Sequence, residues 1–173
     1  MRKFLLYFFI LLLLSALSFV FFYHENPVKF NSITVPKKFS ISIPEYLIAT
    51  DSIDPSSLLQ YKNEKEQMFL LVREKMDTVQ QPLETIFKKF SDDLISNMEN
   101  GNLVKYFPVK INDHDAFIGN IRGSVNETGV YYRIAVIKST DTMCFEIIIG
   151  TTDNDKSRYD EDMDKIIRGF EVY

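Results

Sequence analysis

Five side chains near the C-terminus have the spacing of the calcium ligands in an EF-hand loop. Positions 1, 3, 5, 9 and 12 of such a loop correspond to Asp153, Asp155, Ser157, Glu161 and Asp164. An EF-hand turns at a glycine in its sixth position and ends on a bidentate glutamate, but Arg158 and Asp164 stand there. We therefore interpret the stretch as a solvated loop followed by a helix start that favours acidic residues. A looser, weak cation site is the alternative.

A second acidic group surrounds one of the two histidines of the chain. Asp113, His114 and Asp115 are residue types that serve acid–base or metal chemistry. They lie in a short polar segment between two apolar runs, where Asp and Asn commonly bond their own backbone, so we predict an ordinary turn. The other histidine, His24, follows an apolar N-terminal segment. Solvation at a membrane interface explains a histidine at this position without a ligand role.

The sequence contains no recognisable nucleophile or cofactor motif. Cys144 is the single cysteine and lies in an apolar run without a nearby histidine, which is typical of a buried core residue. There is no G-x-S-x-G elbow, no G-x-G-x-x-G and no P-loop. We therefore predict no catalytic residue, no metal and no cofactor.

Two further features have both a functional and a structural interpretation. Four aromatic residues could line a ligand or partner surface: Tyr106, Phe107, Tyr131 and Tyr132. We favour the alternative, that they pack in a sheet covered on both faces. Asn126-Glu127-Thr128 is a glycosylation sequon in a predicted turn, and it matters only in a eukaryotic secretory host.

Length and charge limit the classes of protein that are possible. The 173 residues, with 46% hydrophobic and 25% charged side chains, are typical of one globular domain. The net charge is −4, and without Arg2 and Lys3 there remain 18 basic against 24 acidic side chains. A net-acidic domain without a basic stripe is a poor match for nucleic acid, so we expect no nucleic-acid partner.

The N-terminal segment 1–23 predicts attachment to a membrane. Phe4–Phe22 contains 19 residues without a charge, enough for a helix to cross the hydrocarbon core of a bilayer. Arg2 and Lys3 precede it, so the positive-inside rule places the N-terminus in the cytoplasm and the domain on the periplasmic or extracellular side. The alternative is a signal peptide cleaved at Ala16-Leu17-Ser18, which would give a secreted domain. Both alternatives export the domain.

The remaining chain predicts a linker over 24–38 and one domain over 39–173. Alternating or continuous apolar runs predict strands over Phe39–Pro44, Leu58–Lys62, Met68–Arg73, Val104–Ile111, Ala116–Val125, Val130–Ser139 and Met143–Thr151. Apolar spacing predicts helices over Pro82–Asn100, capped by Gly101, and from Ser157 to Arg168. The expected fold is α+β, an antiparallel sheet with helices packed on both faces, preceded by one transmembrane helix.

These elements resemble a known family. The strand Phe39–Pro44 reads Phe-x-Ile-x-Ile-Pro, and the chain closes on Ile166-Ile167-Arg168-Gly169-Phe170. From Phe39 to Val172 the order of elements resembles the PsbP-like domains, whose last helix ends I-x-x-S-F; Gly169 replaces the usual serine. The family includes an extrinsic photosystem II protein and a nuclear-import cofactor. The resemblance implies an α/β/α sandwich and a role in binding or supporting a larger complex, because the family shares no catalytic residues.

The leading hypothesis is a membrane-anchored exported domain that binds an unidentified protein or supports an envelope assembly without catalysis. The alternative is a small exported hydrolase that uses carboxylates of the Asp113–Asp115 turn or of the Asp153–Asp164 stretch. A pocket joining either stretch to Arg122 or Arg133, with a carboxylate of raised pKa, would favour the hydrolase. A third possibility is a module that holds a small apolar ligand between helix and sheet.

Overall fold

The computed structural model of the chain describes residues 28–76 and 80–173, which form ten strands and two helices. The helices are α2 (Leu83–Ile95) and α3 (Lys156–Arg168). The strands are β1 (Phe30–Val35), β2 (Phe39–Pro44), β3 (Ile48–Ala49), β4 (Leu59–Asn63), β5 (Met68–Met76), β6 (Glu99–Ile111), β7 (His114–Val125), β8 (Thr128–Lys138), β9 (Met143–Thr152) and β10 (Glu171–Val172).

The predicted membrane segment Phe4–Phe22, the cleavage-site alternative and His24 lie outside the described residues. Within 28–76 and 80–173, neither helix has the length and apolar character needed to cross a bilayer.

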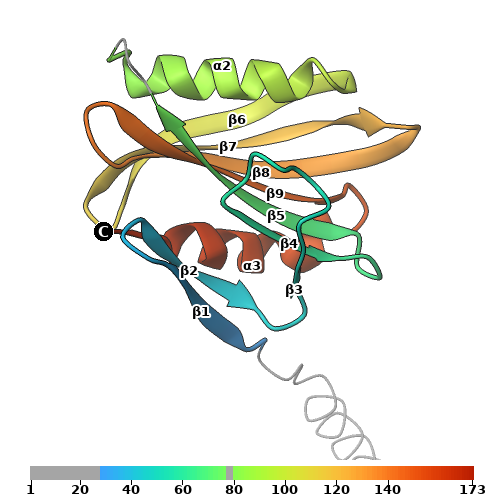
Figure 1. Cartoon of the computed structure of the whole chain (residues 1–173). Helices are drawn as coiled ribbons and strands as arrows, with labels where there is room; N and C mark the ends of the chain where they lie inside the picture. Colours follow the sequence, from blue (N-terminus) through green and yellow to red (C-terminus); the bar gives the residue numbers. More distant parts are fainter. Residues whose placement is uncertain (1–27, 77–79) are drawn as a thin grey trace, which may run out of the picture.

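A seven-stranded antiparallel sheet forms the centre of the domain, in the order β3-β4-β5-β9-β8-β7-β6 (Figure 1). Strands β6 to β9 form the meander that the sequence predicts. Its two tight turns have positive φ at both central residues, with values of 44° and 69° at Asn112 and Asp113 and 49° and 65° at Asn126 and Glu127. This is the pattern of type I′ turns, whose twist matches that of the strands they join.

Helix α2 packs on one face of this sheet, over β6, β7 and β8 (Figure 1). Phe87 and Phe90 on its apolar stripe are buried against the sheet. The Phe87 ring lies 5.6 Å from the Tyr106 ring and 5.8 Å from the Phe117 ring, measured between centroids. Such aromatic pairs add to the free energy gained by burying apolar area.

The end of α2 differs from the sequence prediction of a helix over Pro82–Asn100. The helix ends at Ile95, and Gly101 lies within β6 instead of forming a cap. The Ser96 hydroxyl donates to the carbonyl oxygen of Asp93 at 2.8 Å. Short polar side chains that bond the backbone in this way offer it an alternative to helical bonds, which explains the earlier end.

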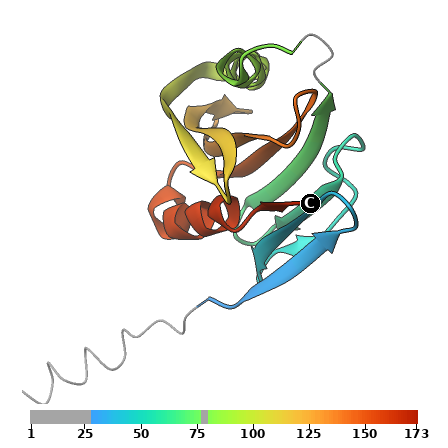
Figure 2. The same ribbon diagram turned by 90° about the vertical axis from the view of Figure 1, so that its left-hand side faces the viewer.

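The opposite face of the sheet is covered by α3 together with a second antiparallel sheet, in the order β1-β2-β10 (Figures 1 and 2). β10 follows α3 and pairs with β2, so that Glu171 lies opposite Ser40. β1 pairs with β2 along its whole length, from Phe30 opposite Pro44 to Val35 opposite Phe39. The segment 24–38, expected to be a linker, thus contains an edge strand.

Each face of the large sheet has its own core. On the α2 face, strand side chains such as Ile121, Ile134 and Ile148 pack with Phe87 and Phe90. On the opposite face, the rings of three residues from β2, β9 and the C-terminal tail meet at centroid distances of 4.7 to 5.3 Å. These residues are Phe39, Phe145 and Phe170.

The predicted fold class, one antiparallel sheet with helices packed on both faces, is wrong. More than half of the described residues lie in strands, and they form two antiparallel sheets with only two helices. The layer opposite α2 is therefore mixed, because β1, β2 and β10 share it with α3. The sequence conceals this second sheet because β1 is half exposed and β10 has two residues.

Candidate functional site

The two acidic stretches lie at opposite ends of the meander. Asp113 occupies the β6–β7 turn, whereas Asp153 follows β9 and donates its backbone N–H to the carbonyl oxygen of Gly129, beside the β7–β8 turn. Successive hairpin turns alternate between the two ends of a sheet. The two groups of carboxylates therefore cannot act together at one site.

At the first end, the residues around His114 bond to neighbouring strands. The ring nitrogen Nδ1 of His114 lies 2.9 Å from the carbonyl oxygen of Lys138. The Asp115 carboxylate accepts from the Lys110 ammonium at 3.0 Å, on the exposed surface. Asp113 is exposed in the turn itself. These contacts stabilise the turn, and Asp113, His114 and Asp115 line one shallow, open depression of about 410 Å³ together with Lys138 and Asp141.

At the second end, the predicted calcium-loop residues spread along α3 instead of surrounding a point. Asp155 accepts from the Thr152 hydroxyl at 2.6 Å, and the α3 residues Glu161 and Asp164 bind Lys165 and Arg168 at 2.7 and 2.6 Å. Across 28–76 and 80–173, no three His, Cys, Asp or Glu residues gather as a metal site.

The start of α3 also differs from its prediction. The helix begins at Lys156, and Asp155 is its N-cap, although its side chain makes no cap hydrogen bond. Ser157, where the helix was predicted to begin, is exposed in the first turn.

The two candidate arginines, Arg122 and Arg133, bind carboxylates of the Asp153–Asp164 stretch. Arg133 donates to the Asp160 carboxylate at 2.8 Å and to its backbone oxygen at 2.9 Å, and its side chain is only 11% exposed. Arg122 lies 3.1 Å from the Asp153 carboxylate, with both side chains nearly half exposed. These contacts link α3 and its preceding loop to β7 and β8.

The four aromatic candidates divide between the two faces of the sheet. Tyr106 stacks on Phe87 and donates its hydroxyl to Glu84 of α2 at 2.9 Å, and Tyr132 also packs on the α2 face. Phe107 and Tyr131 pack on the α3 face. They do not form one surface, because two of them pack on each face of the sheet.

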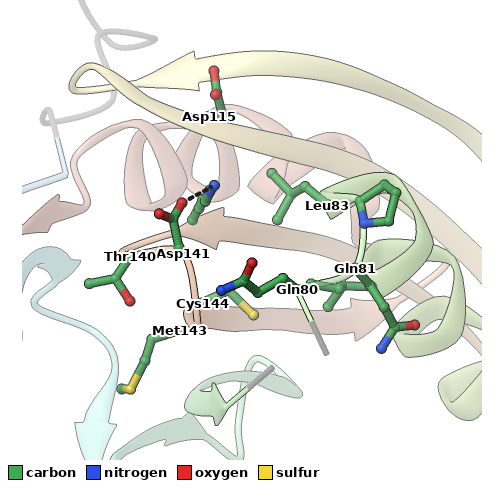
Figure 3. A pocket seen from close by; sticks show the side chains of 11 residues that line it. Gln80, Gln81, Leu83, Asp115, Thr140, Asp141, Met143 and Cys144 are labelled. Carbon is green, nitrogen blue, oxygen red and sulfur yellow. Dashed lines mark hydrogen bonds and ion pairs between the residues drawn. The ribbon is translucent and has the colours of Figure 1, made fainter. Parts of the chain in front are cut away.

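A cleft of about 450 Å³ opens between the start of α2 and the β8–β9 turn (Figure 3). One wall consists of the segment Gln80–Leu83, and the other of Thr140, Asp141 and Met143. Cys144, which is buried, also lines it. Its lining mixes carboxylate, amide, hydroxyl and apolar groups, a combination suited to binding another molecule.

A smaller cleft of about 220 Å³ shares Gln81 and Ile86 with the first and lies between α2 and strands β5 and β9. Phe90 and Glu146 line its inner part, where Glu146 is 7% exposed. Within the described part of the chain, the Glu146 carboxylate has no hydrogen-bond partner. Burial raises its pKa, against the opposing charges of Lys75 and Arg73 on β5.

The sequence reasoning missed Glu146, although a signal was present. It is the single charged residue in the otherwise apolar run Met143–Gly150. Both faces of the strand that contains this run were predicted to be covered. A carboxylate on either face of such a strand is therefore expected to be buried. A buried carboxylate requires an explanation, whether a partner, a shifted pKa or a ligand.

Comparisons with known proteins identify the fold. The sequence matches no protein-family model and no curated protein sequence. Among solved structures, cyanobacterial PsbP (CyanoP) of Synechocystis superimposes with a TM-score of 0.66 at 11% identity, over 87% of this chain and 96% of that one. The Ran-binding protein Mog1p of Saccharomyces cerevisiae superimposes with a TM-score of 0.62 at 12% identity, over 84% and 96%.

Identities this low show a shared fold and nothing finer. The predicted resemblance to PsbP-like domains is confirmed at that level: the described chain has the fold of CyanoP and Mog1p.

Proposed function

We propose that this protein is a non-catalytic binding module on the extracytoplasmic side of a membrane, tethered by Phe4–Phe22, which holds a protein partner of an envelope assembly. The observation that carries the proposal is the open cleft of about 450 Å³ between α2 and the β8–β9 turn. Its rim presents Asp115, Lys138 and Asp141 around an apolar interior that includes Leu83 and Met143. Polar rims around apolar centres are typical of protein interfaces.

Two further observations support binding over hydrolysis. The carboxylates of Asp153, Asp155 and Asp164 are engaged by basic side chains or by a neighbouring hydroxyl, and they do not converge on a nucleophile. The fold itself serves binding elsewhere, since one structure that shares it is described as a Ran-binding protein.

Site-specific crosslinking in the native membrane tests the partner site. A photoreactive residue replaces Thr140 at the cleft, and a matched one replaces Glu127, which is also exposed but lies at the opposite end of the meander. We expect a discrete crosslinked protein from position 140 and none from position 127. Equal crosslinking from both positions, or from neither, would contradict the proposed site.

The tether is tested separately by intact-mass measurement of the membrane and soluble fractions. We expect the full-length chain in the membrane fraction. A soluble form that begins near Phe19 would show cleavage and remove the tether from the proposal, but it would leave the cleft as the proposed partner site.

A further inference from the structure

We propose that the cleft formed by α2, β5 and β9 binds a small zwitterion of amino-acid size, whose ammonium group pairs with Glu146 and whose anionic group lies near Lys75 and Lys89. This inference does not rest on the proposed partner site, although the smaller cleft shares Gln81 and Ile86 with the larger one.

Glu146 offers a carboxylate at the inner end of the cleft. Glu146 is 93% buried, lines the cleft and has no hydrogen-bond partner in the described ranges. The carboxylate oxygens are not fully enclosed, so the group faces the cleft and keeps only part of its hydration. An ammonium group that entered the cleft would supply both the donors and the opposite charge.

The charge of the lining residues changes sign from the inside of the cleft to its mouth. Lys75 and Lys89 line it and are exposed, and Asp93 is the exposed acidic residue among them. The mouth is therefore net positive and the interior negative. A simple cation would meet two lysines on entry, whereas a molecule with an ammonium at one end and a carboxylate at the other matches both regions.

The volume of the cleft is that of a site for a small ligand. Pockets for drug-sized ligands occupy roughly 300–1,000 Å³, and this cleft occupies about 220 Å³. Ile86 and Phe90 provide an apolar wall for a short methylene chain. The space suits a small ligand such as an amino acid.

Calorimetric titration of the detergent-solubilised full-length chain tests the inference. The probes are the unbranched ω-amino acids from 3-aminopropanoate to 6-aminohexanoate, which vary the distance between the two charges. Pentanoate and pentylamine are the matched probes that each lack one charge. We expect at least one ω-amino acid to bind more tightly than both single-charge probes by about tenfold, a difference of about 1.4 kcal/mol.

The Glu146→Gln variant should lose that binding by about tenfold or more, and Asp92→Asn, an exposed carboxylate on α2 outside the cleft lining, should keep it. Unchanged binding by Glu146→Gln, or no binding of any ω-amino acid at about 10 mM, would overturn the proposal. So would equal binding of pentanoate.

The pH dependence of the unmodified chain supplies a readout that needs no variant. The charged groups that face Glu146 are Arg73 and Lys75 from β5 and Lys89 and Asp93 from α2, whereas its β8 neighbour Val136 is apolar. Only the ionised carboxylate attracts an ammonium, so affinity should rise with pH from about 4.5 to neutrality. Affinity that is constant over that range would contradict the role of Glu146.

Discussion

Arg73 and Glu146 lie directly opposite each other on β5 and β9, yet they do not form an ion pair. The Arg73 guanidinium instead donates to the Asp54 carboxylate at 2.6 Å. Asp54 lies in the loop between β3 and β4, where it also accepts from the backbone N–H of Ser56 and the hydroxyl of Ser57. The single arginine thus fixes the loop to the sheet and leaves Glu146 buried without a cation in contact.

This relationship predicts that Glu146→Gln stabilises the domain at neutral pH. Burial raises the pKa of Glu146 above its ordinary value of 4.5, so the folded state binds a proton more tightly than the unfolded state. Stability therefore falls as pH rises from 4.5 through the raised pKa, by about 1.4 kcal/mol per unit of the shift. Urea unfolding across this pH range should show a flatter profile for the variant. A variant less stable than the wild type at neutral pH would contradict the assignment.

The Asp54→Asn substitution should have the opposite effect. Burial acts to raise the pKa of Asp54, but the hydrogen bonds from Ser56, Ser57 and Arg73 outweigh it and hold the pKa well below its ordinary range. The ionised group therefore stabilises the fold above pH 3.8, and this contribution is lost as pH falls through the lowered pKa. We expect a loss of about 1–3 kcal/mol at neutral pH, measured by urea unfolding, which shrinks in acid.

The two substitutions should not be additive. In the Asp54→Asn variant, Arg73 loses its ion pair with residue 54. Glu146, which lies directly opposite Arg73 on β9, can then pair with it. With Glu146→Gln in addition, Arg73 has neither carboxylate, so the double variant should be less stable than the sum of the single effects predicts. Additivity within about 0.5 kcal/mol would show that Arg73 does not turn towards Glu146.

A hydrogen bond between Tyr46 and α3 supports the fourth prediction. The Tyr46 hydroxyl donates to the carboxylate of Asp162 at 2.8 Å, and Asp162 is 8% exposed. Tyr46→Phe removes the donor and leaves the buried carboxylate unsatisfied, which should cost about 1–3 kcal/mol of unfolding free energy. Tyr61→Phe is the matched control, because the Tyr61 hydroxyl is half-buried without a hydrogen bond in the described ranges. Equal losses in both variants would show that the Tyr46 bond has no specific role.

Local sequence signals predicted most of the central sheet. The Asn-Asp and Asn-Glu turns, with the apolar runs beside them, define the meander, because side-chain alternation and turn chemistry are local properties. The start of α2 was also close to its predicted position, since Pro82 and the apolar stripe are local signals. Its end was not, because Ser96 competes for the backbone through its own side chain.

Features that depend on distant contacts were not predicted. The second sheet exists because β10, after α3, returns to pair with β2 from the start of the domain. The environment of Glu146 depends on Arg73 being held by Asp54 in another loop. Neither pairing produces a recognisable pattern in the sequence near the residues concerned. The smaller cleft was not predicted because it also depends on contacts between distant segments.

Gly150 of β9 provides the last prediction, because two aromatic rings meet beside it. Phe69 and Tyr132 lie opposite Gly150 on its two neighbouring strands. Their rings contact each other edge-to-face at a centroid distance of 5.4 Å. A Cβ atom at position 150 would overlap the Phe69 ring. Gly150→Ala should therefore cost about 1–3 kcal/mol of unfolding free energy by forcing the ring aside.

Gly129→Ala is the control for this substitution, since the nearest atom to its Cβ would be the Asp153 Cβ at 3.6 Å, an ordinary contact. It should change stability by no more than about 0.5 kcal/mol. Shortening the ring side chain in the double variant Gly150→Ala/Phe69→Val should recover part of the loss, because the overlapping atoms are then removed. A double variant that is less stable than the sum of the single effects would show that the cost at Gly150 comes from the strand backbone and not from the Phe69 ring.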